Sequence, residues 1–143
     1  MHTNRLTIKT AVYVIFEKDG KTLFLRRYNT GWSDGLYTLP AGHIDPGEKP
    51  LESAVREIKE EICLDVSDNQ LELVHVMFEK DAYIDFYFLA HGWVGSPRIG
   101  EEEKCDKMDW LNLDAHYSEI IPKIALVLKN IQEKKIYSEI DRV

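Results

Sequence analysis

The segment from residue 50 to residue 64 constrains the fold most, because it predicts a helix with one apolar face and one acidic face. Pro50 suits the first helical turn, where its missing N–H would have had no partner. The apolar residues recur at helical spacing and form one stripe: Leu51, Val55, Ile58 and Ile62. Such a stripe is stable only when it is buried, so the helix is expected to lie against a second layer.

Three glutamates lie beside this apolar stripe. Helical geometry places Glu61 about 40° from Glu57, with Glu60 about 60° from Glu57 on its other side. Crowded like charges destabilise a helix by roughly 0.2–0.5 kcal/mol per pair, and a divalent cation between them reverses the sign. Arg56 comes four residues before Glu60 and can hold carboxylates in place. The alternative is a solvated acidic face that binds nothing.

The rest of the chain predicts strands on both sides of this helix. Runs rich in β-branched and aromatic residues indicate strands at residues 7–17, 22–28, 36–39, 71–79, 83–91 and 105–111. Asp19-Gly20 predicts a hairpin turn between the first two, and a second helix is expected at residues 118–135. The strand at 83–91 is apolar on both faces apart from Asp85, as expected of a central strand. This order predicts one α/β (α+β) domain over residues 1–143, with helices covering a mixed sheet.

Charge and cysteine content disfavour several classes of function. The chain has 25 acidic and 18 basic residues and a net charge of -7, so repulsion disfavours nucleic acid and anionic membranes as partners. A small phosphorylated ligand would still bind if cations bridged that repulsion. The two cysteines, Cys63 and Cys105, do not suggest a disulfide framework or a zinc site. No apolar run approaches the length of a membrane span, and a cytoplasmic protein is expected.

The segment from Gly42 to Leu64, GHIDPGEKPLESAVREIKEEICL, resembles the signature of the Nudix hydrolases. That signature reads G-x5-E-x7-R-E-U-x-E-E-x-G-U, where U is a bulky aliphatic residue, and all but one of its fixed positions match. The resemblance implies an α/β/α sandwich with a loop–helix–loop site that binds Mg²⁺ or Mn²⁺. It also implies hydrolysis of nucleoside diphosphates linked to a further group, with water attacking one phosphorus.

The resemblance also assigns roles to residues within this segment. The metal ligands that it implies are Glu57, Glu61, Glu60 and the carbonyl of Gly42. Glu60 would alternatively act as the general base. Arg56 would orient the glutamates, and Glu48 would hold the loop.

Cys63 stands where the signature has glycine. A glycine just past a helix suits the left-handed conformation, which costs other residues roughly 1 kcal/mol or more. Cys63 is therefore expected either to adopt that conformation or to extend the helix by one residue. A buried structural cysteine is expected here rather than a catalytic thiol.

Residues around the helix are candidates for the same site. Arg27 ends a strand, and MutT-like relatives use an arginine there to contact phosphate; the alternative is a solvated strand end. His43, in the loop of the segment, would also contact phosphate. Glu103, or Glu101 in the same acidic turn, would supply a metal contact or the general base, although an exposed turn explains both equally well.

The substrate expected from sequence depends on a second resemblance, at residues 97–110. The segment PRIGEEEKCDKMDW resembles P-x-x-x-E-P-E-K-x-x-x-x-x-W of MutT-like nucleoside triphosphate hydrolases, with Glu102 replacing the proline. ADP-ribose hydrolases of the family tend to carry proline where Glu79 stands. The first expectation is therefore hydrolysis of a nucleoside triphosphate to monophosphate and pyrophosphate. A nucleoside diphosphate sugar or related substrate, and a nucleotide sensor without turnover, are the alternatives; a homodimer is also compatible with the family.

Overall fold

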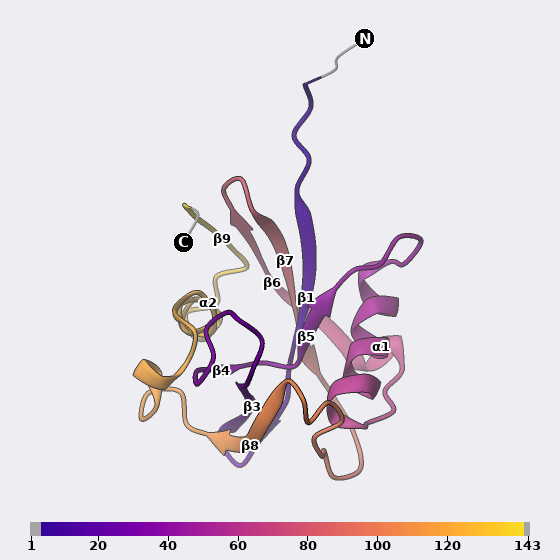
Figure 1. Ribbon diagram of the computed structural model, residues 1–143, viewed down its shortest axis with the longest axis vertical. Coiled ribbons are helices and arrows are strands. Elements are labelled where there is room, and N and C mark those ends of the chain that lie inside the picture. Colours follow the sequence, from indigo (N-terminus) through magenta and orange to yellow (C-terminus); the bar gives the residue numbers. More distant parts are fainter. Residues whose placement is uncertain (1–3, 142–143) are drawn as a thin grey trace.

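A computed structural model describes residues 4–141 of the chain (Figure 1). The regular elements are β1 (Lys9–Ile15), β2 (Glu17–Lys18), β3 (Lys21–Arg27), β4 (Tyr37–Thr38), β5 (Ala41–His43), α1 (Pro50–Ile62), β6 (Leu71–Glu79), β7 (Tyr83–Ala90), β8 (Cys105–Leu111), α2 (Pro122–Gln132) and β9 (Tyr137–Ile140). Short 3₁₀ turns occupy Asp68–Gln70 and Tyr117–Glu119. Across residues 4–141, neither helix has the length and apolar content that crossing a membrane requires.

The larger of two sheets forms the middle layer of the molecule. Its strand order is β5-β1-β7-β6-β9, in which β1 pairs parallel with β7 and β6 pairs parallel with β9. The helices α1 and α2 lie on opposite sides of this sheet (Figure 1). In the smaller sheet, β3 pairs with β2, β4 and β8. The expected α/β/α sandwich around a mixed sheet is confirmed.

Alternation along the central strands divides the core into two clusters. Val12 and Val14 of β1 pack in the cluster that contains the apolar stripe of α1, where Ile58 and Ile62 are fully buried. Tyr13 and its alternate neighbours pack in the other cluster, which contains the buried face of α2. Leu51 and Val55 of the same stripe are partly buried, so this face of α1 packs on the sheet and leaves the glutamates at its margin.

The second helix is shorter than the sequence pattern predicted. A helix over 118–135 was expected, but α2 begins at Pro122 and ends at Gln132. Proline within a helix removes a hydrogen bond and clashes with the preceding turn, whereas at the first position it costs nothing. Ile120 and Ile121 have helical spacing and are buried, but they pack from the linker that precedes the helix.

Two further differences concern strands. The strand expected at 7–17 is divided at Phe16, since β1 belongs to the larger sheet and β2 to the smaller one. The strand β9 was not predicted at all, because YSEI is short and half exposed and shows no long apolar run. The hairpin at Asp19-Gly20 is confirmed, with φ of 53° and 75° at its two central residues.

The helix α1 ends at Ile62, and Cys63 adopts the left-handed conformation with φ 60° and ψ 33°. The first of the two alternatives for this residue is therefore the one found. The cost is about 1 kcal/mol relative to glycine. Both cysteines are free, and Cys105 is buried, whereas Cys63, which was expected to be buried, is only partly so.

Candidate active site

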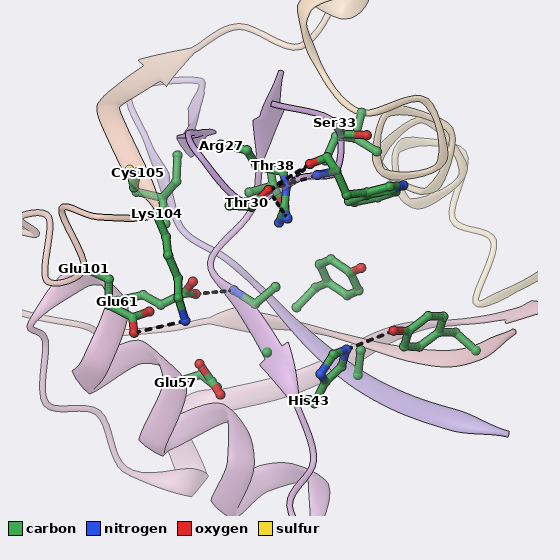
Figure 2. Close-up of a pocket in the computed structure, with 18 of the residues that line it drawn as sticks. Arg27, Thr30, Ser33, Thr38, His43, Glu57, Glu61, Glu101, Lys104 and Cys105 are labelled. Atoms are coloured by element: carbon green, nitrogen blue, oxygen red, sulfur yellow. Dashed lines mark hydrogen bonds and ion pairs between the residues drawn. The ribbon is translucent and has the colours of Figure 1, made fainter. Parts of the chain in front are cut away.

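A single cavity of about 1010 Å³ is lined by the carboxylates of Glu57, Glu60, Glu61 and Glu101, and also by Asp45 and Glu79. The first three come from α1, and Glu101 comes from the loop that precedes β8. Figure 2 shows Glu61 and Glu101 on one side of this cavity and His43 on the other. The cavity thus brings together residues that the sequence pattern had placed on a helix and on a distant turn.

Glu61 is the most deeply buried of these carboxyl groups. Its Oε1 accepts a hydrogen bond of 2.6 Å from the backbone N–H of Ala41. Burial raises the pKa of Glu61 to about 8, and the charges of Glu57 and Glu101 add to the rise against the effect of that hydrogen bond. Without a cation, this group is therefore mostly protonated near neutral pH.

Glu57 lies directly against Gly42 of β5. A Cβ atom at Gly42 would overlap the carboxyl group of Glu57, so only glycine leaves room for it there. Glu57 Oε1 accepts a hydrogen bond of 2.8 Å from Arg56 Nη1. Burial raises the pKa of Glu57 even so, with Arg56 opposing the rise. The close fit of Glu57 against this strand gives its carboxylate a defined position.

Arg56 connects the helix to the loop before it. Its Nε donates to Glu48 Oε2 at 2.7 Å and its Nη2 donates to Glu48 Oε1 at 2.9 Å, a two-pronged contact. Nη2 also donates to the carbonyl of His43 at 3.2 Å, and Nη1 approaches Glu60 Oε2 at 3.4 Å. The hydrogen bonds from Arg56 lower the pKa of Glu48 to about 2. One guanidinium therefore ties the loop to two of the cavity's carboxylates.

The donor set fits a hard divalent cation in part. Among residues 4–141, no three His, Cys, Asp or Glu side chains are already arranged as a complete metal-binding group. Mg²⁺, however, is usually held by one or two carboxylates and completes its shell with water and substrate phosphates. Beyond the effect of burial, the charge of Glu101 raises the pKa of both Glu57 and Glu61, and the charge of Glu57 also raises the pKa of Glu61. A cation would relieve that repulsion, so the residues present fit such an ion.

The two acidic candidates of the turn before β8 are placed differently. Glu101 lines the cavity, with its Oε2 3.9 Å from Lys104 Nζ, whereas Glu103 is exposed and does not line it. The loop is docked on the end of α1, since Gly100 N donates to Glu61 O at 2.8 Å and Arg98 N donates to Ile62 O at 3.0 Å. A Cβ at Gly100 would overlap the carbonyl of Glu60. The sequence preferred Glu103, but the structure brings Glu101 to the cavity.

Arg27 and His43 both line the cavity, as the phosphate-contact prediction requires. Arg27 Nε donates to the carbonyl of Trp32 at 2.7 Å, and its guanidinium lies 5.0 Å from the centre of the Trp32 ring. The Nε2 atom of His43 lies 3.0 Å from the hydroxyl of Tyr83. Both side chains are held in place by these contacts, and Arg27 faces the cavity from the end of β3 (Figure 2).

Sequence reasoning missed two lysines of the cavity wall, Lys104 and Lys123. Lys123 contacts the buried Asp85, which lies in another element of the chain. A lysine after proline at a helix start looks like an ordinary solvated residue. The one available signal was Asp85 itself, a single acidic residue in an otherwise apolar strand.

Comparison with known proteins places these features in a family. A family model described as NUDIX domain matches residues 6–131. The chain is 46% identical over 105 residues to an ADP-ribose pyrophosphatase of Methanocaldococcus jannaschii, covering 70% of this chain and 62% of the relative. It is 33% identical over 90 residues to the asymmetrical bis(5'-nucleosyl)-tetraphosphatase of Mus musculus, covering 57% of this chain and 60% of the relative. The chain therefore spans only about three fifths of the length of these relatives.

Solved structures show the same fold at lower identity. A MutT NUDIX hydrolase from Burkholderia pseudomallei superposes with a TM-score of 0.77 at 22% identity, covering 87% of this chain and 98% of that one. A NUDIX hydrolase from Nitrosomonas europaea gives a TM-score of 0.79 at 22% identity, covering 97% and 82%. At such identities the likeness concerns the fold alone.

Proposed function

The chain belongs to the NUDIX family, and we propose on that premise that it hydrolyses a phosphoanhydride bond of a small nucleotide with a divalent cation. The observation that carries the proposal is the set of four glutamates that α1 and the loop before β8 contribute to the wall of one cavity, together with the basic residues Arg27 and Lys104. Acidic groups alone would repel a diphosphate, so the arrangement makes sense for a ligand that arrives with a cation.

Glu57 and Glu61 would hold the ion, Mg²⁺ or Mn²⁺, with Glu60 and the carbonyl of Gly42 as further ligands. When bound, such an ion neutralises phosphate charge and lowers the pKa of a coordinated water. The contacts of Arg56 with Glu57 and Glu60 support a role in orienting these carboxylates.

A general base would come from Glu60 or from the acidic turn before β8. Glu60 is half exposed, with a side-chain exposure of 48%, so it can reach a water molecule in the cavity. In the turn, we assign Glu101 to the role first expected of Glu103, because Glu101 lines the cavity. Arg27, His43 and Lys104 would contact phosphate oxygens.

Two substrate classes are candidates. The relative from Methanocaldococcus jannaschii, at 46% identity, favours a nucleoside diphosphate joined to a second group, with ADP-ribose first. The likeness of residues 97–110 to MutT-like enzymes favours a nucleoside triphosphate, cleaved to monophosphate and pyrophosphate. ADP-ribose hydrolases of the family tend to carry proline where this chain has Glu79. The side chain of Glu79 lines the same cavity, so it can influence which of the two substrate classes binds.

Purified protein with Mg²⁺ would be assayed against ADP-ribose, a nucleoside diphosphate sugar, dinucleoside polyphosphates and the nucleoside triphosphates, with the products separated. Release of AMP and ribose 5-phosphate supports the first class, and release of pyrophosphate supports the second. Binding without turnover of any phosphoanhydride would favour the nucleotide sensor and overturn the hydrolase. The cytoplasmic localisation and the homodimer stay predictions. Sedimentation analysis would test the homodimer.

The metal assignment has its own test in Glu61→Gln, which keeps the shape of the side chain and removes its charge. We expect at least about a hundredfold loss of kcat/KM, since the ion's contribution amounts to several kcal/mol. Glu72→Gln is the matched control, because Glu72 is an exposed glutamate of β6 that pairs with His91. Equal activity of both variants would contradict the assignment.

A further inference from the structure

The end of the cavity away from Glu61 holds a group of buried charges that the proposed reaction does not use. The side chain of Lys123, in the first turn of α2, is 9% exposed, and those of Asp85 and Glu79 are 0% and 8% exposed. Lys123 Nζ lies 3.2 Å from Asp85 Oδ2 and 3.9 Å from Glu79 Oε1. Because Lys123 and Glu79 both line the cavity, a charged donor stands beside a charged acceptor on its wall.

Aromatic rings adjoin this pair. Lys123 Nζ lies 5.0 Å from the centre of the Tyr83 ring and 5.8 Å from that of Tyr13. His43 stacks on Tyr83, with ring centres 5.7 Å apart, and all these side chains line the cavity. Figure 2 places His43 across the cavity from Glu61 and Glu101. The rings of Tyr13 and Tyr83 and the donor–acceptor pair thus lie together, and His43, the candidate phosphate contact, stacks on Tyr83.

Fold stability is a poor explanation for this pair. Burying two charges costs desolvation energy that their attraction often fails to recover, and apolar residues of similar volume commonly serve as well. Asp85 Oδ1 is buried and has no hydrogen-bond partner among the described residues, which is a further cost. A better explanation for the buried pair is that Lys123 offers its ammonium group to a ligand in the cavity. Asp85 fixes the position of that group.

We propose that Lys123 and Glu79 bind the hydrogen-bonding edge of the substrate's nucleobase, with Asp85 as the residue that positions Lys123. Lys123 donates to an oxo group or ring nitrogen, and Glu79 accepts from the adjacent N–H group. The three side chains carry a net negative charge, which disfavours phosphate at this end. A neutral planar heterocycle fits both the aromatic walls and the pair. The proposal rests on the proposed function, because it assigns the nucleoside end of the same substrate.

Equilibrium binding tests the base site without turnover. Calorimetric titrations with Mg²⁺ present would compare AMP, GMP, CMP and UMP with ribose 5-phosphate, which lacks a base. We expect the wild-type protein to bind at least one of the four at least about tenfold more tightly than ribose 5-phosphate, as hydrogen bonds to charged groups imply. The double variant Lys123→Met/Asp85→Asn should lose this preference and keep its affinity for ribose 5-phosphate.

The double variant removes one positive and one negative charge together, so the net charge of the group is unchanged and Asp85 is not left as a buried ion without its partner. Glu79 loses its 3.9 Å contact with Lys123. Its matched control is Lys129→Met/Asp114→Asn, which removes the exposed ion pair of 2.6 Å made by the same helix outside the cavity. Both affinities should stay at wild-type values in that control. Glu79→Gln, which exchanges an acceptor oxygen for a donor, provides a second variant and should change the order of preference among the four bases.

Equal wild-type affinity for the nucleotides and for ribose 5-phosphate would overturn the base site. So would a double variant that keeps the preference, or one that loses affinity for both kinds of ligand alike, since that indicates a structural role. The proposed hydrolase fails on a different result: a protein that shows the base preference but cleaves no phosphoanhydride would refute the hydrolase and leave the base site standing.

Discussion

Glu61 is a carboxyl group held away from water, so its protonation links the stability of the metal-free protein to pH. Its pKa is raised from 4.5 to about 8, mainly by burial. The folded state therefore binds its proton more tightly than the unfolded state does, and the stability it contributes is present below about pH 4.5 and lost as the pH rises through about 8. In the presence of a chelator, we expect urea denaturation to show a free energy of unfolding that falls over this range by a few kcal/mol.

Glu61→Gln has no such proton to lose, so its free energy of unfolding should change much less over the same range. Added Mg²⁺ should restore wild-type stability most at high pH, because the ion favours the ionised carboxylate. Glu72→Gln, at an exposed site, should keep the wild-type slope. Parallel pH profiles for the wild-type protein and Glu61→Gln would show that another group carries the dependence.

Arg56 tests how far the loop depends on one guanidinium. Lysine cannot reproduce its paired hydrogen bonds to Glu48 together with its contact to Glu57. We expect Arg56→Lys to lower the free energy of unfolding by about 2 kcal/mol or more, measured from urea midpoints at constant m-value.

Arg26 offers a matched comparison for that substitution. It makes an equally two-pronged contact with Asp106, but both side chains are about one third exposed. Arg26→Lys should lower the urea midpoint less than Arg56→Lys does, since solvent weakens such pairs. Similar losses in the two variants would mean that burial and the further contacts of Arg56 add nothing.

Among the secondary-structure elements, α1 was the most predictable from sequence. The least predictable part was the end of the cavity away from Glu61, where Lys123 contacts Asp85. The register of Glu57, Glu60 and Glu61 follows from helical geometry, which is local and needs no knowledge of the fold. The choice of Glu101 over Glu103 depends on how a loop docks against a helix end, and two neighbouring glutamates in a turn carry no signal of that kind.

The pairing of Lys123 with Asp85 depends on α2 crossing the far face of the central sheet. Neither residue has a neighbour in sequence that would reveal the contact. Similarly, β9 exists because β6 offers it an edge, not because its four residues favour a strand. Tertiary context decided both.

The docking of the loop before β8 onto α1 should control the position of Glu101. Gly100→Ala places a methyl group against the carbonyl of Glu60 and should displace the loop. We expect Mg²⁺ affinity, measured by calorimetry, to fall by about 10–100-fold, as for other groups that orient metal ligands.

Gly20→Ala is the control for that substitution. Gly20 has a φ of 75° and open space around it, so alanine there strains the β2–β3 turn but meets no neighbour. It should cost about 1 kcal/mol of stability and leave Mg²⁺ affinity unchanged. If Gly100→Ala also left the Mg²⁺ affinity unchanged, the result would contradict a role for Glu101 in metal binding.

In the molecule as a whole, β9 pairs with β6 and covers a strand that would otherwise be the edge of the larger sheet. A chain ending at Lys135 would lose β9 and uncover the main chain of β6. The buried His75 of β6 would also lose its 2.7 Å contact with the hydroxyl of Ser138. We expect such a protein to self-associate, seen as larger species in size-exclusion chromatography, because a long unpaired edge strand pairs readily with another copy.

Ser138→Ala separates the two effects of that truncation. It removes the hydrogen bond to His75 but leaves β9 in place, so it should cost about 1 kcal/mol and elute as the wild-type protein does. A truncated chain that elutes like the wild-type protein would show that β6 tolerates exposure.

The parallel pairing of β1 with β7 has a consequence for the order in which the domain assembles. Lys9 lies beside Tyr83 and Ile15 beside Leu89, so the centre of the sheet closes only after the whole of α1 has been synthesised. Contacts between residues so distant in sequence are slow to form, because the loop entropy is lost before the contacts are gained. On a nascent chain, the glutamates of α1 therefore precede the sheet against which their helix packs, and the cavity is among the last features to appear.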